Sequence, residues 1–264
     1  MKIGFIGLGN MASAMIGGML EKKIVTLEDI TGADAFESAV QKAQEKFGIY
    51  VSTDNLTVVR QADVIVLSVK PQFYMDVIMG IREAVREDQI IITIAPGKTI
   101  NWLQEQFGKK LKLIRCMPNT PALVGEGCTG VCPSEAVSEE EMRYVLTLLN
   151  SFGKAYVVSE HMMDAVVAVS GSSPAYVFML IEAMADEAVL EGMPRNLAYE
   201  FAAQAVLGSA KMVLETGRHP GELKDMVCSP GGTTIEAVKV LEEKGFRASV
   251  MDAMKACADK SRSL

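Results

Sequence analysis

The stretch "KIGFIGLGNMA", Lys2 to Ala12, sets the fold of this 264-residue chain. It is a short apolar run with Gly7, Gly9 and Ala12 after it in the spacing G-x-G-x-x-A. In dinucleotide-binding units the first glycine permits a tight turn, the second lets a pyrophosphate approach the backbone, and a small third residue lets the helix pack on the strand. Because a glycine-rich turn without a ligand can have this spacing, the prediction depends on the segments downstream of the turn.

Segments of alternating β and α character come after this turn. A helical stretch, Met11 to Glu21, comes first, and further β-type runs are "DIT", "ADVIVLSV" and "QIIITIA". The stretches "FESAVQKAQEKFG", "YMDVIMGIREAV" and "INWLQEQFG" have helical spacing. The alternation predicts an α/β domain over residues 1–157, with the doubly wound parallel sheet of Rossmann-like proteins.

Ligands of such sheets bind beyond the carboxyl ends of the strands. Two of these ends, "SVKPQ" and "APG", place proline or glycine where a strand must stop. Lys70 could meet phosphate or ribose there, or it could be a solvated turn residue. After a later strand, Pro118 and Pro121 bracket Asn119 and Thr120, which suits a loop lining a cofactor cleft and equally a rigid surface turn.

The residue after the second strand bears on the choice of cofactor. An acidic side chain about 20 residues beyond the glycine motif binds the ribose hydroxyls of NADH, whereas arginine suits the 2′-phosphate of NADPH. The stretch "ITGADAF" offers Asp34 and no arginine. This favours NADH and leaves NADPH as the alternative.

The second half of the chain has a different character. Its long, alanine- and methionine-rich segments are "SPAYVFMLIEAMADEAVLEGM", "NLAYEFAAQAVLGSAKMVLETG" and "TTIEAVKVLEEKGF". They predict an all-helical domain over residues 158–264. Helices that are apolar on more than one face must be buried, either in a homodimer that interleaves them or in a core shared with the first domain. We expect a homodimer or an assembly of dimers.

Composition excludes several classes of protein. The chain is 49% hydrophobic and carries 26 basic against 33 acidic residues, for a net charge of −7, so it lacks the basic footprint of a nucleic-acid-binding protein. Its five cysteines and two histidines have no zinc-site spacing, and no metal site is expected. Glycines interrupt the apolar N-terminus, which fits neither a signal peptide nor a membrane span. We expect a cytoplasmic protein with reduced thiols and no membrane partner.

Two hydroxyl-rich helix starts, "SGSSPAY" and "CSPGGTT", are candidate sites for chemistry. In the second, Thr233 and Glu236 have the spacing of a capping box. That leaves unexplained the two glycines, Gly231 and Gly232, and the second hydroxyl, Thr234, which we expect at the first helical position. A small carboxylic acid bound at this helix start would explain them, because glycines permit close approach and free amides favour an anion.

The chain closely resembles pyrroline-5-carboxylate reductase through "GFIGLGNMA", "SVKPQ", "MPNTPA", "GSSPAYVF", "AAQAVLGSAKM" and "KDMVCSPGGTTIEAV". The resemblance runs nearly end to end. It implies reduction of the C=N bond of 1-pyrroline-5-carboxylate to L-proline, the last step of proline biosynthesis, by NADPH or NADH. It also implies that Thr234 is the catalytic residue, through a hydrogen bond to the ring nitrogen.

The resemblance supplies most of the remaining predicted site residues. Those expected to bind substrate are Ser229, Gly231, Gly232, Thr233, Ser172 and Ser173, the two last near the nicotinamide. Together with Asp34, those expected to bind the dinucleotide are Ile6, Gly7, Leu8, Gly9, Asn10, Met11, Ala12, Asn55, Val69, Lys70, Pro71, Gln72, Ala95, Pro96 and Gly97. Two residues depart from the family: Pro96 stands where an alanine is more usual and has no N–H to donate, and Asp34 stands where many relatives have serine or a basic residue.

Two rival functions remain at this point. A β-hydroxyacid dehydrogenase opens with a similar turn, but it needs a catalytic lysine on the first long helix of its second domain, and residues 170–192 contain no lysine. A dinucleotide-sensing dimer would not need two hydroxyl-rich helix starts.

Overall fold

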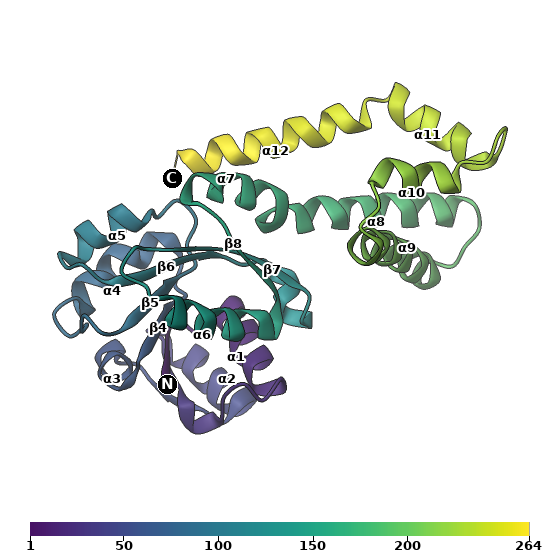
Figure 1. Cartoon of the computed structure of the whole chain (residues 1–264). Coiled ribbons are helices and arrows are strands. Elements are labelled where there is room, and N and C mark those ends of the chain that lie inside the picture. The colour runs from purple at the N-terminus through teal and green to yellow at the C-terminus, as the bar shows by residue number, and fades with distance from the viewer. Residues whose placement is uncertain (264) are drawn as a thin grey trace. The chain divides into compact units, whose positions relative to one another are not determined.

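The computed structural model describes residues 1–263, which form two compact units (Figure 1). The first unit comprises Met1–Ser172 and the residues from Cys257 onward, and the second is Ser173–Ala256. The expected boundary between residues 157 and 158 differs from this division. The division falls later because helical residues 163–171 pack on the sheet, where Val166 contacts the position of Gly130.

The first unit is built on one sheet, whose eight strands within the described residues have the order β3-β2-β1-β4-β5-β6-β7-β8. The strands are β1 (Ile3–Ile6), β2 (Ile30–Ala33), β3 (Tyr50–Ser52), β4 (Val64–Leu67), β5 (Ile90–Thr93), β6 (Lys112–Met117), β7 (Gly127–Pro133) and β8 (Gly153–Val157). The strands from β3 to β6 are parallel, as predicted. The strand order reverses between β1 and β4, which is where doubly wound folds bind their ligands.

The sheet is not parallel throughout, because β7 pairs antiparallel with β6. Only residues 118–126 join these two strands, and a parallel crossover needs a dozen residues or more. The β8 strand then pairs parallel with β7. The predicted parallel sheet therefore extends from β3 to β6, and its pairing becomes mixed at the β7 edge.

Helices cover both faces of the sheet (Figure 1). One core layer joins the sheet to α1 (Asn10–Glu21), α2 (Glu37–Phe47) and α6 (Glu139–Leu149). The other joins it to α3 (Asn55–Gln61), α4 (Tyr74–Ile81) and α5 (Ile100–Phe107). Strand residues alternate between the layers, since Phe5 lies in the first and Ile6 in the second.

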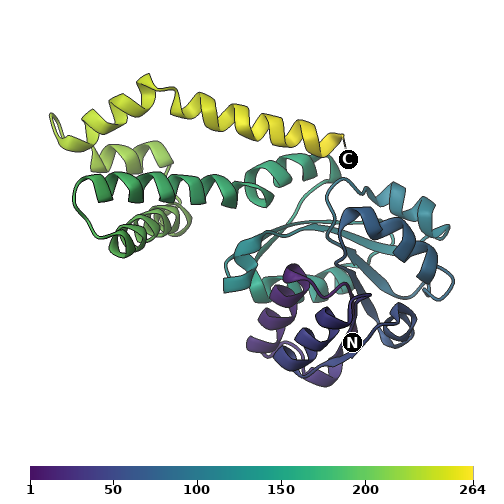
Figure 2. The same ribbon diagram turned by 180° about the vertical axis from the view of Figure 1, so that it is seen from behind.

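The C-terminal residues return to the first unit beside α7 (Met163–Val166), as Figure 2 shows. There the Ser261 hydroxyl donates a hydrogen bond of 2.7 Å to the Asp164 carboxylate. This bond ties the chain end to the segment that comes after the sheet.

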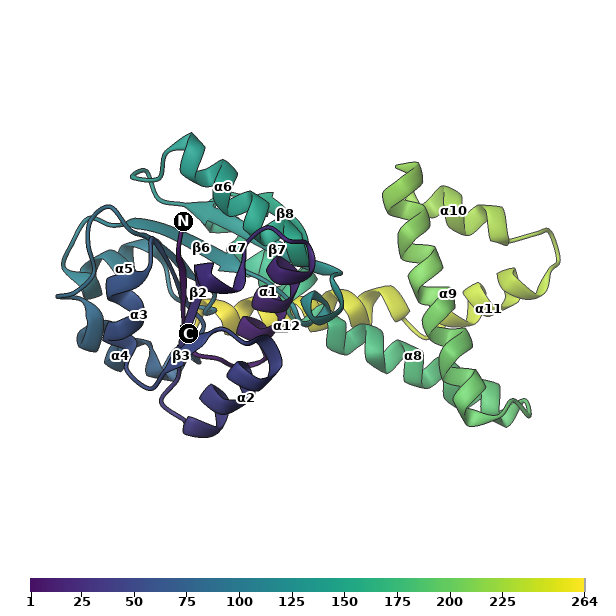
Figure 3. The same cartoon turned by 90° about the horizontal axis from the view of Figure 1, so that it is seen from below.

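The second unit is entirely helical within its described residues, as predicted. Its elements are α8 (Ser173–Leu190), α9 (Arg195–Thr216), α10 (Pro220–Val227), α11 (Thr233–Glu243) and the first part of α12 (Phe246–Arg262). The longest pair, α8 and α9, pack against each other (Figure 3). Large apolar side chains on both remain exposed, including Phe178, Met179, Phe201 and Leu207.

Candidate active site

The turn between β1 and α1 has the geometry that its glycines predict. Gly7 has a φ of +96°, and a Cβ there would lie 2.8 Å from the Ser68 backbone. The Ser68 hydroxyl donates to the Gly7 carbonyl at 2.7 Å, which fixes the turn. Gly9 precedes α1 and has no heavy atom within 4 Å of the place its Cβ would take, while Ala12 is fully buried. The N-terminus of α1 is thus open to a pyrophosphate.

Asp34, at the end of β2, is hydrogen-bonded to this turn. Its carboxylate accepts from the Leu8 N–H at 2.8 Å and from the Phe36 N–H at 3.0 Å. These bonds hold a negative charge beside the glycine-rich turn. Asp34 directly follows β2, the position from which the sequence expectation has an acidic side chain reach the ribose, and the same carboxylate is hydrogen-bonded to the glycine-rich turn.

The predicted residues of the first unit gather at the carboxyl edge of the parallel strands. Val69 to Gln72 come after β4, Ala95 to Gly97 come after β5, and Asn55 opens α3 directly after β3. Gly97 has a φ of +74°, which favours glycine. Because β1 to β5 run in one direction, these loops share an edge with the glycine-rich turn.

Tyr74 fixes this edge, and the sequence patterns did not predict it. The buried Tyr74 hydroxyl donates to the Leu67 carbonyl at 2.6 Å, lies 2.9 Å from the Thr93 hydroxyl and accepts from the Ile94 N–H at 3.3 Å. It therefore joins the ends of β4 and β5, which carry two of the predicted binding loops. Burial raises the pKa of Tyr74 to about 12, so the phenol remains a neutral donor. One feature of the sequence could have indicated this role: a tyrosine stands directly after the turn that ends a buried strand.

Ser172 lies at the end of a π-helical turn, Val167–Gly171. Its backbone N–H donates to the Val167 carbonyl at 2.8 Å, and its hydroxyl accepts from the Cys257 thiol at 3.2 Å. Single π-helical turns occur often at functional sites. Ser173 is the next residue and begins α8.

The second helix start differs from its sequence prediction in two ways. The α11 helix begins at Thr233, so Thr234 occupies the second helical position rather than the first. Gly232 is the N-cap, and within the described residues no side chain caps this helix. The predicted capping box of Thr233 and Glu236 is therefore wrong. Because Thr233 is already helical, its hydroxyl is not placed to cap the first turn.

The two glycines before α11 have separate structural reasons. The Gly232 N–H donates to the Ser229 carbonyl at 3.0 Å, closing a turn whose third residue, Gly231, has a φ of +67°. A proline in second place and a glycine with positive φ in third place are typical of type II turns. A Cβ at Gly232 would clash with the Ser229 hydroxyl. The turn therefore leaves the first-turn amides of α11 without a side-chain cap.

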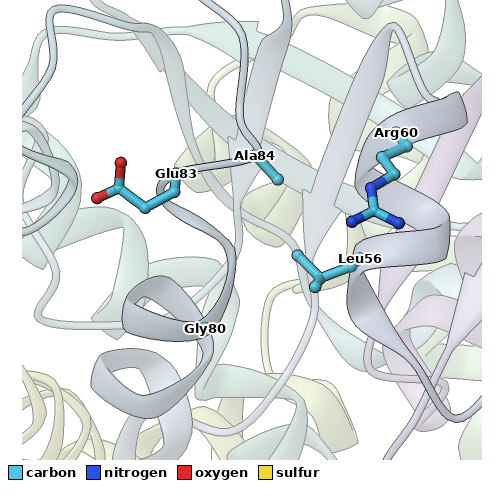
Figure 4. Close-up of a pocket in the computed structure, with 5 residues that line it drawn as sticks. All are labelled: Leu56, Arg60, Gly80, Glu83 and Ala84. Atoms are coloured by element: carbon cyan, nitrogen blue, oxygen red, sulfur yellow. The ribbon is translucent and has the colours of Figure 1, made fainter.

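A surface hollow has none of these predicted residues in its lining. It occupies about 450 Å³ between α3 and α4 and is lined by Leu56, Arg60, Gly80, Glu83 and Ala84 (Figure 4). The Glu83 carboxylate points away from Arg60. The predicted site residues lie at the strand ends and helix starts, and none of them lines this hollow.

The fold and the open glycine-rich turn at the strand-order reversal define a dinucleotide-dependent oxidoreductase. Residues 2–97 match the family model described as "NADP oxidoreductase coenzyme F420-dependent", and residues 160–264 match "Pyrroline-5-carboxylate reductase dimerisation". A pyrroline-5-carboxylate reductase of Escherichia coli is 52% identical over 263 residues, covering 100% of this chain and 98% of its own length. The chain belongs to the pyrroline-5-carboxylate reductase family.

Solved structures agree with this assignment. A pyrroline-5-carboxylate reductase from Coxiella burnetii superposes with a TM-score of 0.92 at 32% identity, covering 99% of this chain and 97% of that one. A Plasmodium falciparum pyrroline carboxylate reductase with NADP bound gives 0.90 at 33% identity, with the same coverage of the two chains. The expected fold, an N-terminal Rossmann-like unit and a C-terminal helical one, is confirmed.

Proposed function

We propose that this enzyme reduces the C=N bond of 1-pyrroline-5-carboxylate to L-proline, with NADPH or NADH as the hydride source. The observation that carries the proposal is the full-length likeness to pyrroline-5-carboxylate reductases, at 52% identity to the E. coli protein. One hydride joins the ring carbon and one proton joins the ring nitrogen. The bound nicotinamide supplies the hydride, and the protein binds, orients and polarises the imine.

The dinucleotide would lie along the carboxyl edge of the first unit. The open N-terminus of α1, with Gly9 unobstructed, suits the pyrophosphate. The loops after β3, β4 and β5 would hold the rest of the cofactor, and Tyr74 keeps the last two of these loops in register. Pro96 would contribute only its ring and its carbonyl, because it has no N–H.

The substrate carboxylate would bind at the start of α11. The uncapped first-turn amides and the helix dipole favour an anion there, by about 0.3–1 kcal/mol from the dipole alone. Thr234 stands in that first turn, and its hydroxyl would hydrogen-bond the ring nitrogen. Since threonine is a poor acid, we assign it to orienting the nitrogen and relaying a proton from water. The serines at 172 and 173 would line the nicotinamide side.

We further propose that two copies pair through the helical unit. The helical run Glu160–Leu190 contains an 18-residue window with a mean hydropathy of 1.4 and is long and apolar enough, by length and composition, to cross a membrane. The family model that covers it describes dimerisation, so a second copy would bury its apolar face. The five cysteines are free thiols, which fits the expected cytoplasmic location.

Oxidation of NADPH and NADH by 1-pyrroline-5-carboxylate, monitored by absorbance, tests the function. We expect turnover with the wild type and a loss of roughly 10²–10⁴-fold in kcat for Thr234→Ala, the range of a positioned proton-transfer group. Dinucleotide affinity, measured by fluorescence, should barely change. Thr234→Ser should retain most of the wild-type kcat, because serine keeps the hydroxyl.

Thr216→Ala is the matched control, since that hydroxyl donates to the Met212 carbonyl of its own helix and accepts from the Arg218 N–H just after it. It should leave turnover unchanged. Near-normal turnover of Thr234→Ala would remove Thr234 from the mechanism. A second result would contradict the function: the folded wild type binds the reduced dinucleotide but does not oxidise it, either with this substrate or with its six-membered homologue. That result would favour a dinucleotide sensor.

A further inference from the structure

Asn119 is a buried amide that joins three separate segments of the first unit. It lies in the connection between β6 and β7 and is 8% exposed. Its Oδ1 accepts from the Cys128 N–H at 2.8 Å, at the start of β7. Its Nδ2 donates to the Ser170 carbonyl at 2.9 Å, inside the π-helical turn before Ser172. The two ends of one amide thus make two different connections.

The Ser170 carbonyl needs this donor because of the residue four positions later. In an α-helix, the partner of this carbonyl would be the N–H of residue 174. Residue 174 is proline, which has no N–H and whose ring clashes with the carbonyl four residues before it. The chain relieves the clash with the π-helical turn, and the Asn119 amide replaces the missing donor.

The π-helical turn in turn sets the position of Ser172. The Ser172 N–H closes the turn on the Val167 carbonyl, so any change in the turn displaces this residue. The turn lies directly on the sheet, because Met117 lies 2.8 Å from the position of a Gly171 Cβ and Val166 lies 2.7 Å from that of a Gly130 Cβ. Asn119 is the polar link between this turn and the sheet edge.

We propose that Asn119 is a positioning residue for the reduction: its bond to the Ser170 carbonyl fixes the π-helical turn and so orients the Ser172 hydroxyl. The inference rests on the proposed function, in which Ser172 lines the nicotinamide side of the site. The Asn119 oxygen has a structural role at β7, and the Asn119 nitrogen has the functional one. A substitution that replaces only the Asn119 nitrogen can therefore test the functional role without removing the structural one.

Asn119→Asp makes this separation. The carboxylate can still accept from the Cys128 N–H, but it cannot donate to Ser170. We expect kcat for 1-pyrroline-5-carboxylate to fall about 10-fold or more, the effect of losing one buried hydrogen bond near the reaction, with dinucleotide affinity unchanged. Amide hydrogen exchange of residues 167–173 should accelerate, while that of β7 should not. Asn150→Asp is the matched control, because among the described residues the hydrogen bond of its side chain is one in which Oδ1 accepts from the Ala155 N–H.

Two further variants show whether Asn119 acts through Ser172. In a Ser172→Ala background, the Asn119→Asp change should cost little additional kcat, because coupled residues are not additive. Pro174→Ala restores an N–H to residue 174, so in that background the Asn119→Asp protein should regain protection from exchange and much of its rate.

Several results would overturn the inference. The first is an Asn119→Asp protein with unchanged kcat and unchanged amide exchange at residues 167–173. The second is a loss of kcat that is fully additive with that of Ser172→Ala. The third is an Asn119→Asp protein that loses dinucleotide affinity as much as it loses rate. If the wild type fails to reduce the imine, the proposed function fails. The exchange measurement then still tests the link between Asn119 and the turn, and unchanged exchange would refute that link by itself.

Discussion

Asp34 places a carboxylate directly beside the glycine-rich turn. It accepts the Leu8 N–H, and the nearby Phe36 N–H also points at it. The next charged residue is Glu37, at the start of α2, so residues 34–41 offer two acidic side chains and no basic one. A 2′-phosphate placed near this loop would meet negative charge without a cation to balance it. We therefore expect Asp34 to bear on the choice between NADPH and NADH.

We predict that Asp34→Ser shifts the ratio of kcat/KM for NADPH over NADH upward by about 10-fold or more, equivalent to about 1.4 kcal/mol. The reason is the removal of like-charge repulsion towards the phosphate. The measurement is dinucleotide oxidation with 1-pyrroline-5-carboxylate at low salt.

Asp34→Asn separates charge from hydrogen bonding, because one oxygen can still accept the Leu8 N–H. It should shift the preference nearly as far as serine does. Glu37→Gln, on the exposed start of α2, should shift it less. An unchanged ratio in both Asp34 variants would place the phosphate discrimination elsewhere.

At the scale of an element, the turn between β1 and α1 assigns different physical roles to its two glycines. Gly7 combines a positive φ with a backbone 2.8 Å from where its Cβ would lie, whereas Gly9 has open space on that side. The fold requires the first glycine, whereas the second leaves room for the pyrophosphate that we expect to bind here.

We predict opposite outcomes for the two alanine variants. Gly7→Ala should lower the free energy of unfolding by about 1–3 kcal/mol, because its backbone is strained and its surroundings blocked. Gly9→Ala should leave the midpoint of thermal unfolding unchanged and weaken dinucleotide binding, measured by fluorescence titration. Normal dinucleotide affinity in Gly9→Ala would mean that the pyrophosphate does not approach this turn.

The first residues of two helical segments show that a local sequence pattern does not by itself predict where a helix begins. Thr233 and Glu236 have the spacing of a capping box, yet α11 begins one residue earlier with Gly232 as N-cap. The turn closed by Ser229 sets the chain direction into the helix, and it outweighs the local capping preference. The π-helical turn before Ser172 was not predicted for a related reason, because the donor to its Ser170 carbonyl comes from residue 119, which is distant in sequence.

At the scale of the whole molecule, the helical unit leaves many of its large apolar side chains exposed to solvent in a single chain. Phe178 and Phe201 are 59% and 60% exposed, and Leu214 is 79% exposed. Exposed apolar surface of this extent marks an interface. It lies within the region that matches the dimerisation model.

We predict that light scattering gives at least twice the chain mass of 28.5 kDa. Phe201→Glu should produce a smaller species or an aggregate, since a charge would be buried without a partner. Glu200→Gln, its neighbour on α9, should leave the mass unchanged. A wild type that remains monomeric at all concentrations, or that binds lipid vesicles instead, would contradict the proposed pairing.

The amino-acid sequence was sufficient to predict the dinucleotide-binding unit, the parallel strands from β3 to β6, the helical second unit and the family. These depend on local requirements: glycines for turns, periodicity for strands and helices, and motifs in their order along the chain. Three features became visible only in three dimensions: β7 runs antiparallel, Tyr74 joins the ends of β4 and β5, and Asn119 supplies the donor that Pro174 removes. The short connection before β7 is local, but the hydrogen bonds of Tyr74 to the β5 end and of Asn119 to Ser170 join residues 19 and 51 positions apart, which meet only once the sheet has formed. No local pattern can show which buried polar group will find which partner.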